Sequence, residues 1–247
     1  RVGRCGVGGT QRRLTRPGFA HMDSKKKQLL FKILVIGDVG TGKTSIIRKY
    51  VHNMFSDSYK STIGVDFALK VVHMDDWMVR MQLWDIAGQE RFGQMTRVYY
   101  KDAVGAFVVF DVSRPDTFEG VLKWKADVAR KVQLPDGTPV PSIMVGNKCD
   151  IEKEKWCKSV ADIEQVAEEQ GFDGWCLTSA KTGEGLSDQP GGAIHMLLSK
   201  IMKRMEESGS LQNSSAQSPA SSSTGESSNL RFSQAPGGAP EKKKGCC

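Results

Sequence analysis

The segment Gly37–Thr44 constrains the fold more than any other part of the sequence. It reads Gly-Asp-Val-Gly-Thr-Gly-Lys-Thr, which matches the pattern G-x-x-x-x-G-K-[ST], and it separates a run of β-forming residues from a helical pattern. In that context the motif predicts a phosphate-binding loop. Its glycines let backbone N–H groups wrap around an oxyanion, and the helix N-terminus adds partial positive charge. Lys43 is expected to reach the β- and γ-phosphates, and Thr44 to hold Mg²⁺.

Apolar runs alternate with amphipathic segments from about Leu29 to Glu207. The runs expected to be strands are 29–36, 67–74, 79–84, 104–110, 142–145 and 175–177, and the helical patterns are 44–53, 117–132, 159–169 and 193–207. Asp75-Asp76 indicates one antiparallel hairpin. This order predicts an α/β domain with the P-loop NTPase fold: a mostly parallel six-stranded sheet with helices on both faces. Its ligands are expected at the carboxyl ends of the strands.

The two ends of the chain differ in composition from the domain at 29–207. Residues 1–28 are expected to form a disordered basic extension, because residues 1–21 hold five Arg and no acid. An Arg-rich transit peptide is one alternative, although upstream or added sequence with Met22 as the natural start is favoured. Residues 208–247 are rich in Ser, Gly, Pro and Gln, which predicts a disordered tail. No apolar run reaches the roughly 18–20 residues of a membrane span.

Charge and cysteine spacing argue against two classes of protein. Without the five arginines of residues 1–21, 30 basic and 28 acidic residues remain, so the domain is nearly neutral and no nucleic-acid partner is expected. The six cysteines contain no C-x-x-C pair, which argues against a zinc site or a disulfide framework. Cys149, Cys157 and Cys176 are therefore expected to be reduced thiols.

Two motifs that follow later strands predict guanine as the base. Asn147-Lys148-Cys149-Asp150 comes after the run 142–145, and the Asp150 carboxylate can accept from the ring N–H and the exocyclic amine of guanine. Adenine lacks this pair of donors. Thr178-Ser179-Ala180-Lys181 follows the next strand, and its backbone N–H can meet the guanine carbonyl oxygen. The aliphatic stems of Lys148 and Lys181 can cover the faces of the base.

A third group of residues is placed to sense the γ-phosphate. Trp84–Glu90 follows a strand, and within it Asp85 is expected to hold Mg²⁺ through water. Gly88 lets the backbone approach the γ-phosphate, and Gln89 can orient the attacking water. Thr62 is a second candidate metal ligand, on a loop that is free to move, although for this residue taken alone an ordinary loop threonine is the favoured interpretation. A segment ordered by the γ-phosphate and released after hydrolysis is a switch.

These segments resemble the Rab branch of the Ras-like small GTPases over residues 29–207, and again at the terminal Cys-Cys. The stretches close to Rab hallmarks are Ile63–Phe67, Gln82–Asp85, Ala87–Phe92 and Tyr99-Tyr100. Ile86 stands where Rabs usually have Thr. Together with 104–111 and 122–125, it is similar to the subgroup that serves melanosomes and other lysosome-related organelles.

The resemblance implies a set of site residues. It implies that Phe55 packs on the guanine and that Phe67, Trp84 and Tyr99, next to Ile63, form an effector surface; core packing is the alternative for the three aromatics. Catalysis is assigned to Gln89 and Lys43. The expected metal ligands are Thr44, Thr62 and Asp85. The expected GTP-binding residues are Val39, Gly40, Thr41, Gly42, Lys43, Thr44, Ser45, Phe55, Thr62, Gly88, Asn147, Lys148, Asp150, Ser179, Ala180 and Lys181.

The resemblance also implies partners and a location. Cys246 and Cys247 are expected to carry geranylgeranyl groups, and Lys242–Lys244 to add attraction to anionic lipid; a solvated tail with inert thiols is the alternative. The expected partners are an exchange factor, a GTPase-activating protein with an arginine finger, an escort protein, a GDP-dissociation inhibitor and GTP-dependent effectors. The core is expected to be monomeric and to act at the cytoplasmic face of intracellular membranes.

Three departures from the family pattern stand out. Val39 occupies a position that is small in many relatives, and its branched side chain is expected to crowd the γ-phosphate region and slow hydrolysis. Leu134–Pro139 is expected to form a long turn, and Gln189–Gly192 to delay the start of the last helix. Val39 also favours one rival function, a GTP-locked binding module. A second rival, an ATP-using P-loop enzyme, is opposed by Asp150.

Overall fold

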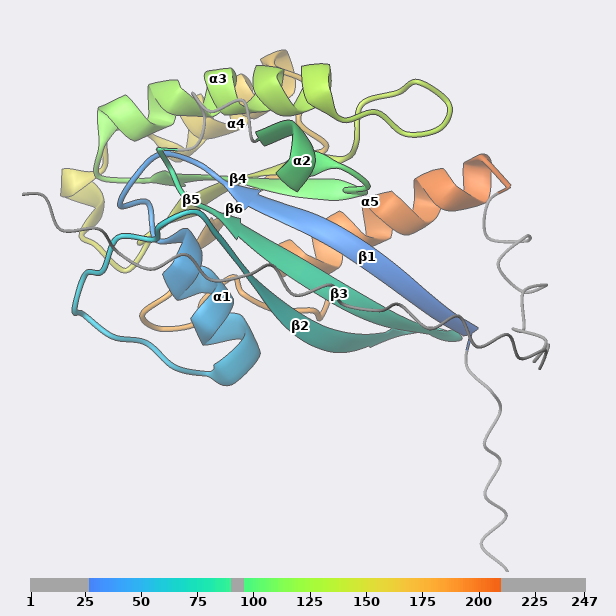
Figure 1. The fold of residues 1–247 in the computed structure, drawn as a ribbon. Helices are drawn as coiled ribbons and strands as arrows, with labels where there is room; N and C mark the ends of the chain where they lie inside the picture. Colours follow the sequence, from blue (N-terminus) through green and yellow to red (C-terminus); the bar gives the residue numbers. More distant parts are fainter. Residues whose placement is uncertain (1–26, 90–95, 210–247) are drawn as a thin grey trace, which may run out of the picture.

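A computed structural model describes residues 27–89 and 96–209 of the chain. Within these ranges a single six-stranded sheet is surrounded by helices (Figure 1). The elements, in chain order, are β1 (Lys27–Ile36), α1 (Lys43–His52), β2 (Val65–Met74), β3 (Trp77–Ile86), α2 (Thr96–Tyr100), β4 (Gly105–Asp111), α3 (Pro115–Lys131), β5 (Ser142–Asn147), the 3₁₀ helix η2 (Lys153–Lys155), α4 (Val160–Glu169), β6 (Gly174–Thr178) and α5 (Ala193–Glu207).

The sheet has the strand order β2-β3-β1-β4-β5-β6. The β2–β3 pair is a hairpin closed by Asp75 and Asp76, and it is antiparallel; the other four neighbouring pairs are parallel. The mostly parallel six-stranded sheet is therefore confirmed. Strands β4 and β5, and the second half of β1 from Ile33 to Ile36, read as nearly continuous apolar runs because helices cover both of their faces there.

Two hydrophobic clusters hold the helices on the sheet. One lies against α1 and α5 and includes Ile46, Ile47, Leu197 and Leu198. The other lies against α2, α3 and α4 and includes Tyr100, Trp124 and Ile163. Figure 1 shows this three-layer arrangement, with α3 and α4 above the sheet and α1 below it. The expectation of helices on both faces is thus confirmed.

The structure corrects several predicted boundaries. The β1 strand begins at Lys27, two residues before the expected start of the domain, because Lys27 and Gln28 still pair with the first residues of β3. Strand β2 begins at Val65 rather than 67 for the same reason, since Val65 pairs with Ile86. Helix α2 was not predicted. It is only one turn long, so its sequence gives no helical period to detect.

The two irregular segments behave as their sequences predict. Helix α5 begins only at Ala193, after Pro190, and its N-cap Gly192 packs so closely that a Cβ there would lie 2.2 Å from the Ser187 carbonyl oxygen. The stretch 134–139 forms a turn closed by a bridge between Gln133 and Pro139. In the described part of the chain, no helix combines the length and the apolar character needed to cross a bilayer.

Candidate functional site

A cleft of about 680 Å³ opens where β1, β3 and β5 end. This volume lies within the range of small-ligand sites. Its walls come from the phosphate loop, from residues 54–66, from the end of β3 and from the loops after β5 and β6. Sixteen of the expected nucleotide, metal and catalytic residues line it: Val39, Gly40, Gly42, Lys43, Thr44, Ser45, Phe55, Thr62, Asp85, Gly88, Gln89, Asn147, Lys148, Asp150, Ala180 and Lys181.

Two expected binding residues, Thr41 and Ser179, lie behind the cleft wall instead of on it. Both are fully buried. The Thr41 hydroxyl donates to the Asp38 carbonyl at 3.0 Å, and the Ser179 hydroxyl donates to Asp150 Oδ1 at 2.5 Å. Their side chains therefore hold the loops that line the cleft, a distinction that the motifs alone do not make.

Lys43 lies inside the phosphate loop. Its ammonium group donates to the carbonyl oxygens of Gly37 at 2.8 Å and Asp38 at 2.9 Å, so the loop curls around it. Burial lowers the pKa of Lys43 to about 8, although the nearby carboxylates of Asp85 and Asp38 act in the opposite direction. A bound polyphosphate would stabilise the charged form of this amine.

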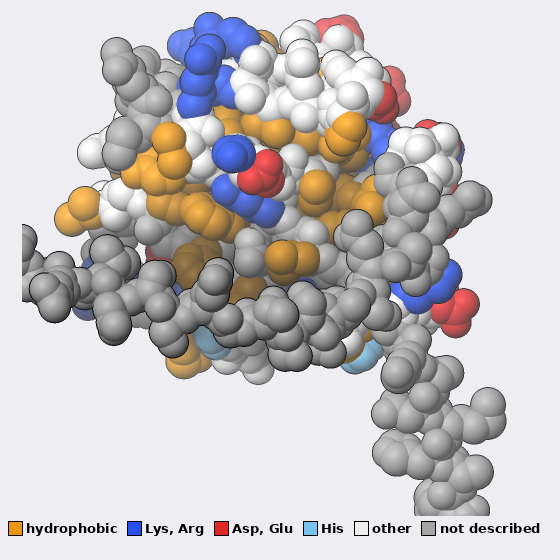
Figure 2. Space-filling view, turned by 45° about the vertical axis from the view of Figure 1, so that its right-hand side comes forward, with side chains coloured by type: hydrophobic (Ala, Val, Ile, Leu, Met, Phe, Trp, Pro, Cys, Tyr) orange, Lys and Arg blue, Asp and Glu red, His pale blue; other side chains and the backbone are white. Residues whose placement is uncertain are grey.

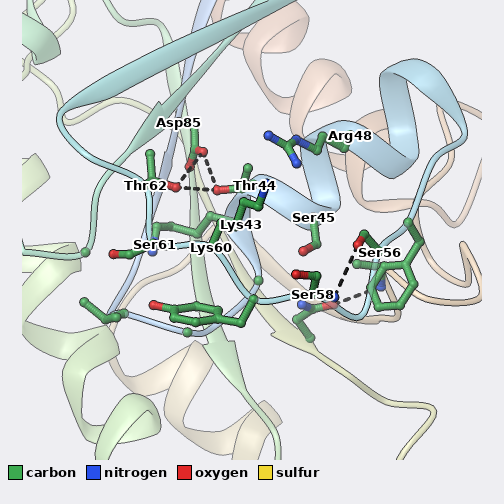
Figure 3. Close-up of a pocket in the computed structure, with 18 of the residues that line it drawn as sticks. Lys43, Thr44, Ser45, Arg48, Ser56, Ser58, Lys60, Ser61, Thr62 and Asp85 are labelled. Atoms are coloured by element: carbon green, nitrogen blue, oxygen red, sulfur yellow. Dashed lines mark hydrogen bonds between the residues drawn. The ribbon is translucent and has the colours of Figure 1, made fainter.

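Three oxygen-bearing side chains from separate elements converge beside Lys43 (Figure 3). Thr44 Oγ1 lies 2.7 Å from Thr62 Oγ1 and donates to Asp85 Oδ2 at 2.5 Å, and Thr62 Oγ1 lies 3.5 Å from the same carboxylate oxygen. The structure thus brings together the three residues expected to hold Mg²⁺, including Thr62, for which a plain loop role was the alternative.

The chemistry of this cluster suits a hard divalent cation. Its donors are two hydroxyls and one carboxylate, which are the oxygen ligands that Mg²⁺ prefers. Asp85 Oδ1 is buried and has no hydrogen-bond partner among the described residues. Burial raises the pKa of Asp85, against the hydrogen bond from Thr44 and the charge of Lys43. A cation at this position would compensate the buried carboxylate.

Asn147 joins the phosphate loop to the base-reading loop. Its Nδ2 donates to the Thr41 carbonyl at 2.8 Å, while its Oδ1 accepts from Ala180 N at 3.2 Å and Thr178 Oγ1 at 3.3 Å. Gly42 passes so near that a Cβ there would lie 2.3 Å from Asn147 Nδ2. Asn147 therefore couples the two halves of the cleft as well as lining it.

Lys148 is held by a residue that sequence reasoning missed. Its ammonium forms an ion pair of 2.6 Å with Asp111 Oδ2, and Asp111 is almost fully buried at the end of β4. The Ser113 hydroxyl and N–H both donate to the other Asp111 oxygen. The position of Asp111, a carboxylate that ends an apolar strand, was the available signal, because ligand sites gather at the carboxyl ends of parallel strands.

The backbone of Gly88 lies directly on the phosphate loop. A Cβ at Gly88 would lie 2.5 Å from Val39 N and 2.6 Å from the carbonyl carbon of Asp38. Only glycine permits this approach, which agrees with the expected role of Gly88 near the γ-phosphate. The neighbouring Gln89 is exposed and lines the cleft.

Two of the residues expected to form an effector surface, Phe67 and Trp84, lie side by side on strands β2 and β3. The Phe67 and Trp84 rings stack with their centroids 5.8 Å apart, and Phe67 and Ile63 are 57% and 95% exposed. Trp84 and Tyr99 are half-buried against the hydrophobic cluster that lies under α2, α3 and α4, so they also contribute to core packing. In Figure 2, apolar side chains (orange) reach the surface around a small charged group.

Other expected features lie outside the described residues. They are the hallmark positions Glu90, Arg91 and Phe92, the extension 1–26, most of the tail, and the terminal Cys246 and Cys247 with their neighbouring lysines. Among the described cysteines, Cys149, Cys157 and Cys176 are free thiols. Burial raises the pKa of Cys149 to about 11 and that of Cys176 to about 12, which keeps these thiols protonated at neutral pH.

Comparison with known proteins agrees with this geometry. Residues 32–201 match the family model described as the Ras family. The Ras-related protein Rab-32 of Homo sapiens is 56% identical over 177 residues, which are 71% of this chain and 76% of the human protein. Rab-32A of Dictyostelium discoideum is 50% identical over 193 residues, covering 77% and 88% of the two chains. Human Rab-7L1 is 46% identical over 179 residues, covering 72% and 85%.

Proposed function

We propose that this chain, which belongs to the Ras family and within it to the Rab small GTPases, recruits effectors to an intracellular membrane while it holds GTP. The observation that carries the proposal is the meeting of two recognition elements in one cleft. The phosphate loop supplies N–H groups and Lys43 at one end, and Asp150, fixed by Ser179, supplies a paired acceptor at the other. A guanine nucleotide is the ligand that needs both.

The residues have distinct roles in the proposed hydrolysis. Lys43 and the N–H groups of the phosphate loop stabilise the charge that develops on the transferring phosphoryl group. Gln89, at the rim of the cleft, orients the attacking water. Thr44, Thr62 and Asp85 would hold Mg²⁺, which neutralises charge on the β- and γ-phosphates when it is bound. A partner supplies an arginine finger.

The contact between Thr62 and Thr44 is the basis of the proposed switch. Thr62 belongs to the loop 53–64, most of whose residues are exposed. When GTP and the metal are present, Thr62 and the Gly88 backbone are held near the γ-phosphate, and hydrolysis removes that hold. The effector surface at Ile63 and Phe67 adjoins these segments, so its shape follows the nucleotide state.

The membrane location follows from the proposed family role. Prenylated Cys246 and Cys247 anchor the chain to the cytoplasmic face of vesicles or of endosomal and lysosome-related organelles, from which an escort protein and a GDP-dissociation inhibitor return it to the cytosol. An exchange factor and a GTPase-activating protein drive the cycle. The tail between Gly209 and the cysteines spaces the domain from the bilayer.

A single-turnover assay with Gln89→Ala tests the hydrolytic role. Protein loaded with γ-labelled GTP and Mg²⁺ should release phosphate, and the variant should do so about tenfold more slowly, since it no longer orients the water. Affinity for GTP should stay within about threefold, because Gln89 lies at the exposed rim. If the unmodified protein releases no phosphate even with an activating protein, the rival function, a GTP-locked binding module, is correct.

Replacing Val39 by glycine should speed intrinsic hydrolysis. Val39 lines the cleft with Gly88 and Gln89, and a displacement of the water by about 1 Å can cost on the order of a hundredfold in rate. We therefore expect slow turnover in the unmodified protein and a gain of up to about a hundredfold in Val39→Gly, with little change in GTP affinity. Equal single-turnover rates for the unmodified protein and Val39→Gly would mean that the Val39 side chain has only a packing role and does not slow GTP hydrolysis.

A further inference from the structure

Helix α3 contacts the phosphate loop through the side chain of its N-cap residue. At its N-cap, Arg114 Nη1 donates to the Val39 carbonyl oxygen at 3.0 Å. The same guanidinium donates through Nη2 to Asp116 Oδ2 at 2.5 Å, which fixes its plane. Gly40 packs against it, since a Cβ at Gly40 would lie 3.1 Å from Arg114 Nη1. Arg114 itself does not line the cleft.

A second contact from α3 fixes the preceding residue of the loop. The indole Nε1 of the fully buried Trp124 donates to Asp38 Oδ1 at 2.9 Å. Gly120 makes room for that carboxylate, because a Cβ there would lie 2.0 Å from Asp38 Oδ2. Asp38 is therefore held by the core of the domain, and the peptide that follows it, between Val39 and Gly40, is contacted by Arg114.

The geometry of a peptide bond converts this contact into a role at the site. The Val39 carbonyl and the Gly40 N–H belong to one planar trans peptide, so they point in opposite directions. Arg114 holds the carbonyl toward α3, and the Gly40 N–H is consequently aimed toward the cleft that Gly40 lines. We infer that Arg114 is a positioning residue for hydrolysis, which keeps the Gly40 N–H directed at the phosphate chain.

This inference rests on the proposed function. It predicts that loss of the Arg114 contact slows hydrolysis much more than it changes nucleotide dissociation. Donors fixed in advance matter most where charge develops in the transition state, and removing one such donor costs about 10²–10³ in rate. Loss of the Arg114 contact misorients the donor without removing it. We therefore expect hydrolysis to fall about tenfold, while the remaining N–H groups of the loop keep nucleotide dissociation within about threefold.

The test compares four variants of the full chain. Arg114→Met removes the guanidinium and keeps much of the apolar stem, whereas Arg114→Lys keeps one donor. Asp116→Asn, an exposed change, weakens only the fixing of the guanidinium plane. Arg130→Met is the matched control, because it removes another exposed arginine of α3 that pairs with an aspartate, Asp127, far from the loop. Each variant is assayed for single-turnover hydrolysis, dissociation of a fluorescent GDP, melting temperature and the Gly40 amide resonance in the GDP-bound state.

The positioning role predicts a graded series. Hydrolysis should fall about tenfold in Arg114→Met and about threefold in Asp116→Asn, recover to within about threefold in Arg114→Lys, and stay unchanged in Arg130→Met. The Gly40 amide resonance should shift upfield in Arg114→Met only. A role limited to stability would lower the melting temperature without moving that resonance.

Three results would overturn the inference. They are hydrolysis by Arg114→Met within twofold of the unmodified rate, an acceleration of GDP dissociation as large as the fall in the hydrolysis rate, or an unmoved Gly40 resonance. If the unmodified protein binds GDP and releases no phosphate from GTP, the proposed function fails, and the Gly40 resonance still decides whether Arg114 orients the peptide.

Discussion

Asp150→Asn is expected to lower GDP affinity by roughly 10²–10⁴-fold. The carboxylate is placed to accept two hydrogen bonds from guanine, and a hydrogen bond to a charged group is worth about 1.5–3 kcal/mol, or about 3–6 kcal/mol for the pair. Ser179 donates to Asp150 Oδ1 at 2.5 Å, so the acceptor is held in place before the base arrives. An asparagine puts an N–H group against one of the guanine donors.

Xanthine nucleotides should bind relatively better to the Asp150→Asn variant, because xanthine carries a carbonyl where guanine has its exocyclic amine. Displacement of a fluorescent GDP by GDP and by xanthosine diphosphate measures both affinities. Glu152→Gln is the matched control, since it neutralises an exposed carboxylate two residues further on that pairs with Lys155. An unchanged GDP affinity in Asp150→Asn would contradict the assignment of Asp150 as the residue that recognises guanine.

Changing both Cys246 and Cys247 to Ser is expected to move the protein from membranes into the soluble fraction. Each buried CH₂ of a lipid chain contributes about 0.8 kcal/mol to membrane binding, so losing two long chains outweighs the attraction from three lysines, at about 1 kcal/mol each. Nucleotide binding should be unaffected, because the cleft is formed entirely within residues 39–181. Fractionation of cells that express the variant measures the change.

The single replacements refine this prediction. With one cysteine left, attachment should be partial or misplaced, because one chain binds a membrane only reversibly. Cys157→Ser, which changes a cysteine of the folded domain, is the control and should leave the distribution unchanged. If the double variant still sediments with membranes, a protein receptor and not lipid holds the chain.

Local sequence determined most of the fold. Apolar runs such as 33–36 and 142–145 became parts of central parallel strands because residues of this kind are stable only when both faces are covered. The motif Gly37–Thr44 predicted its own loop, since its glycines adopt backbone angles that other residues avoid: Gly40 and Gly42 have φ values of +80° and +92°. The late start of α5 after Pro190 followed from proline chemistry.

Tertiary structure alone decided how the motifs act on one another. Nothing in the local sequence of Ser179 shows that its side chain faces the core, because its partner Asp150 comes from a distant segment. The same holds for Lys148 with Asp111 and for Val39 with Arg114. The sequence identifies the side chains and loops whose chemistry suits GTP binding. Their distances arise only when strands far apart in the chain become neighbours, because side-chain contacts between such segments leave no periodic signal in either one.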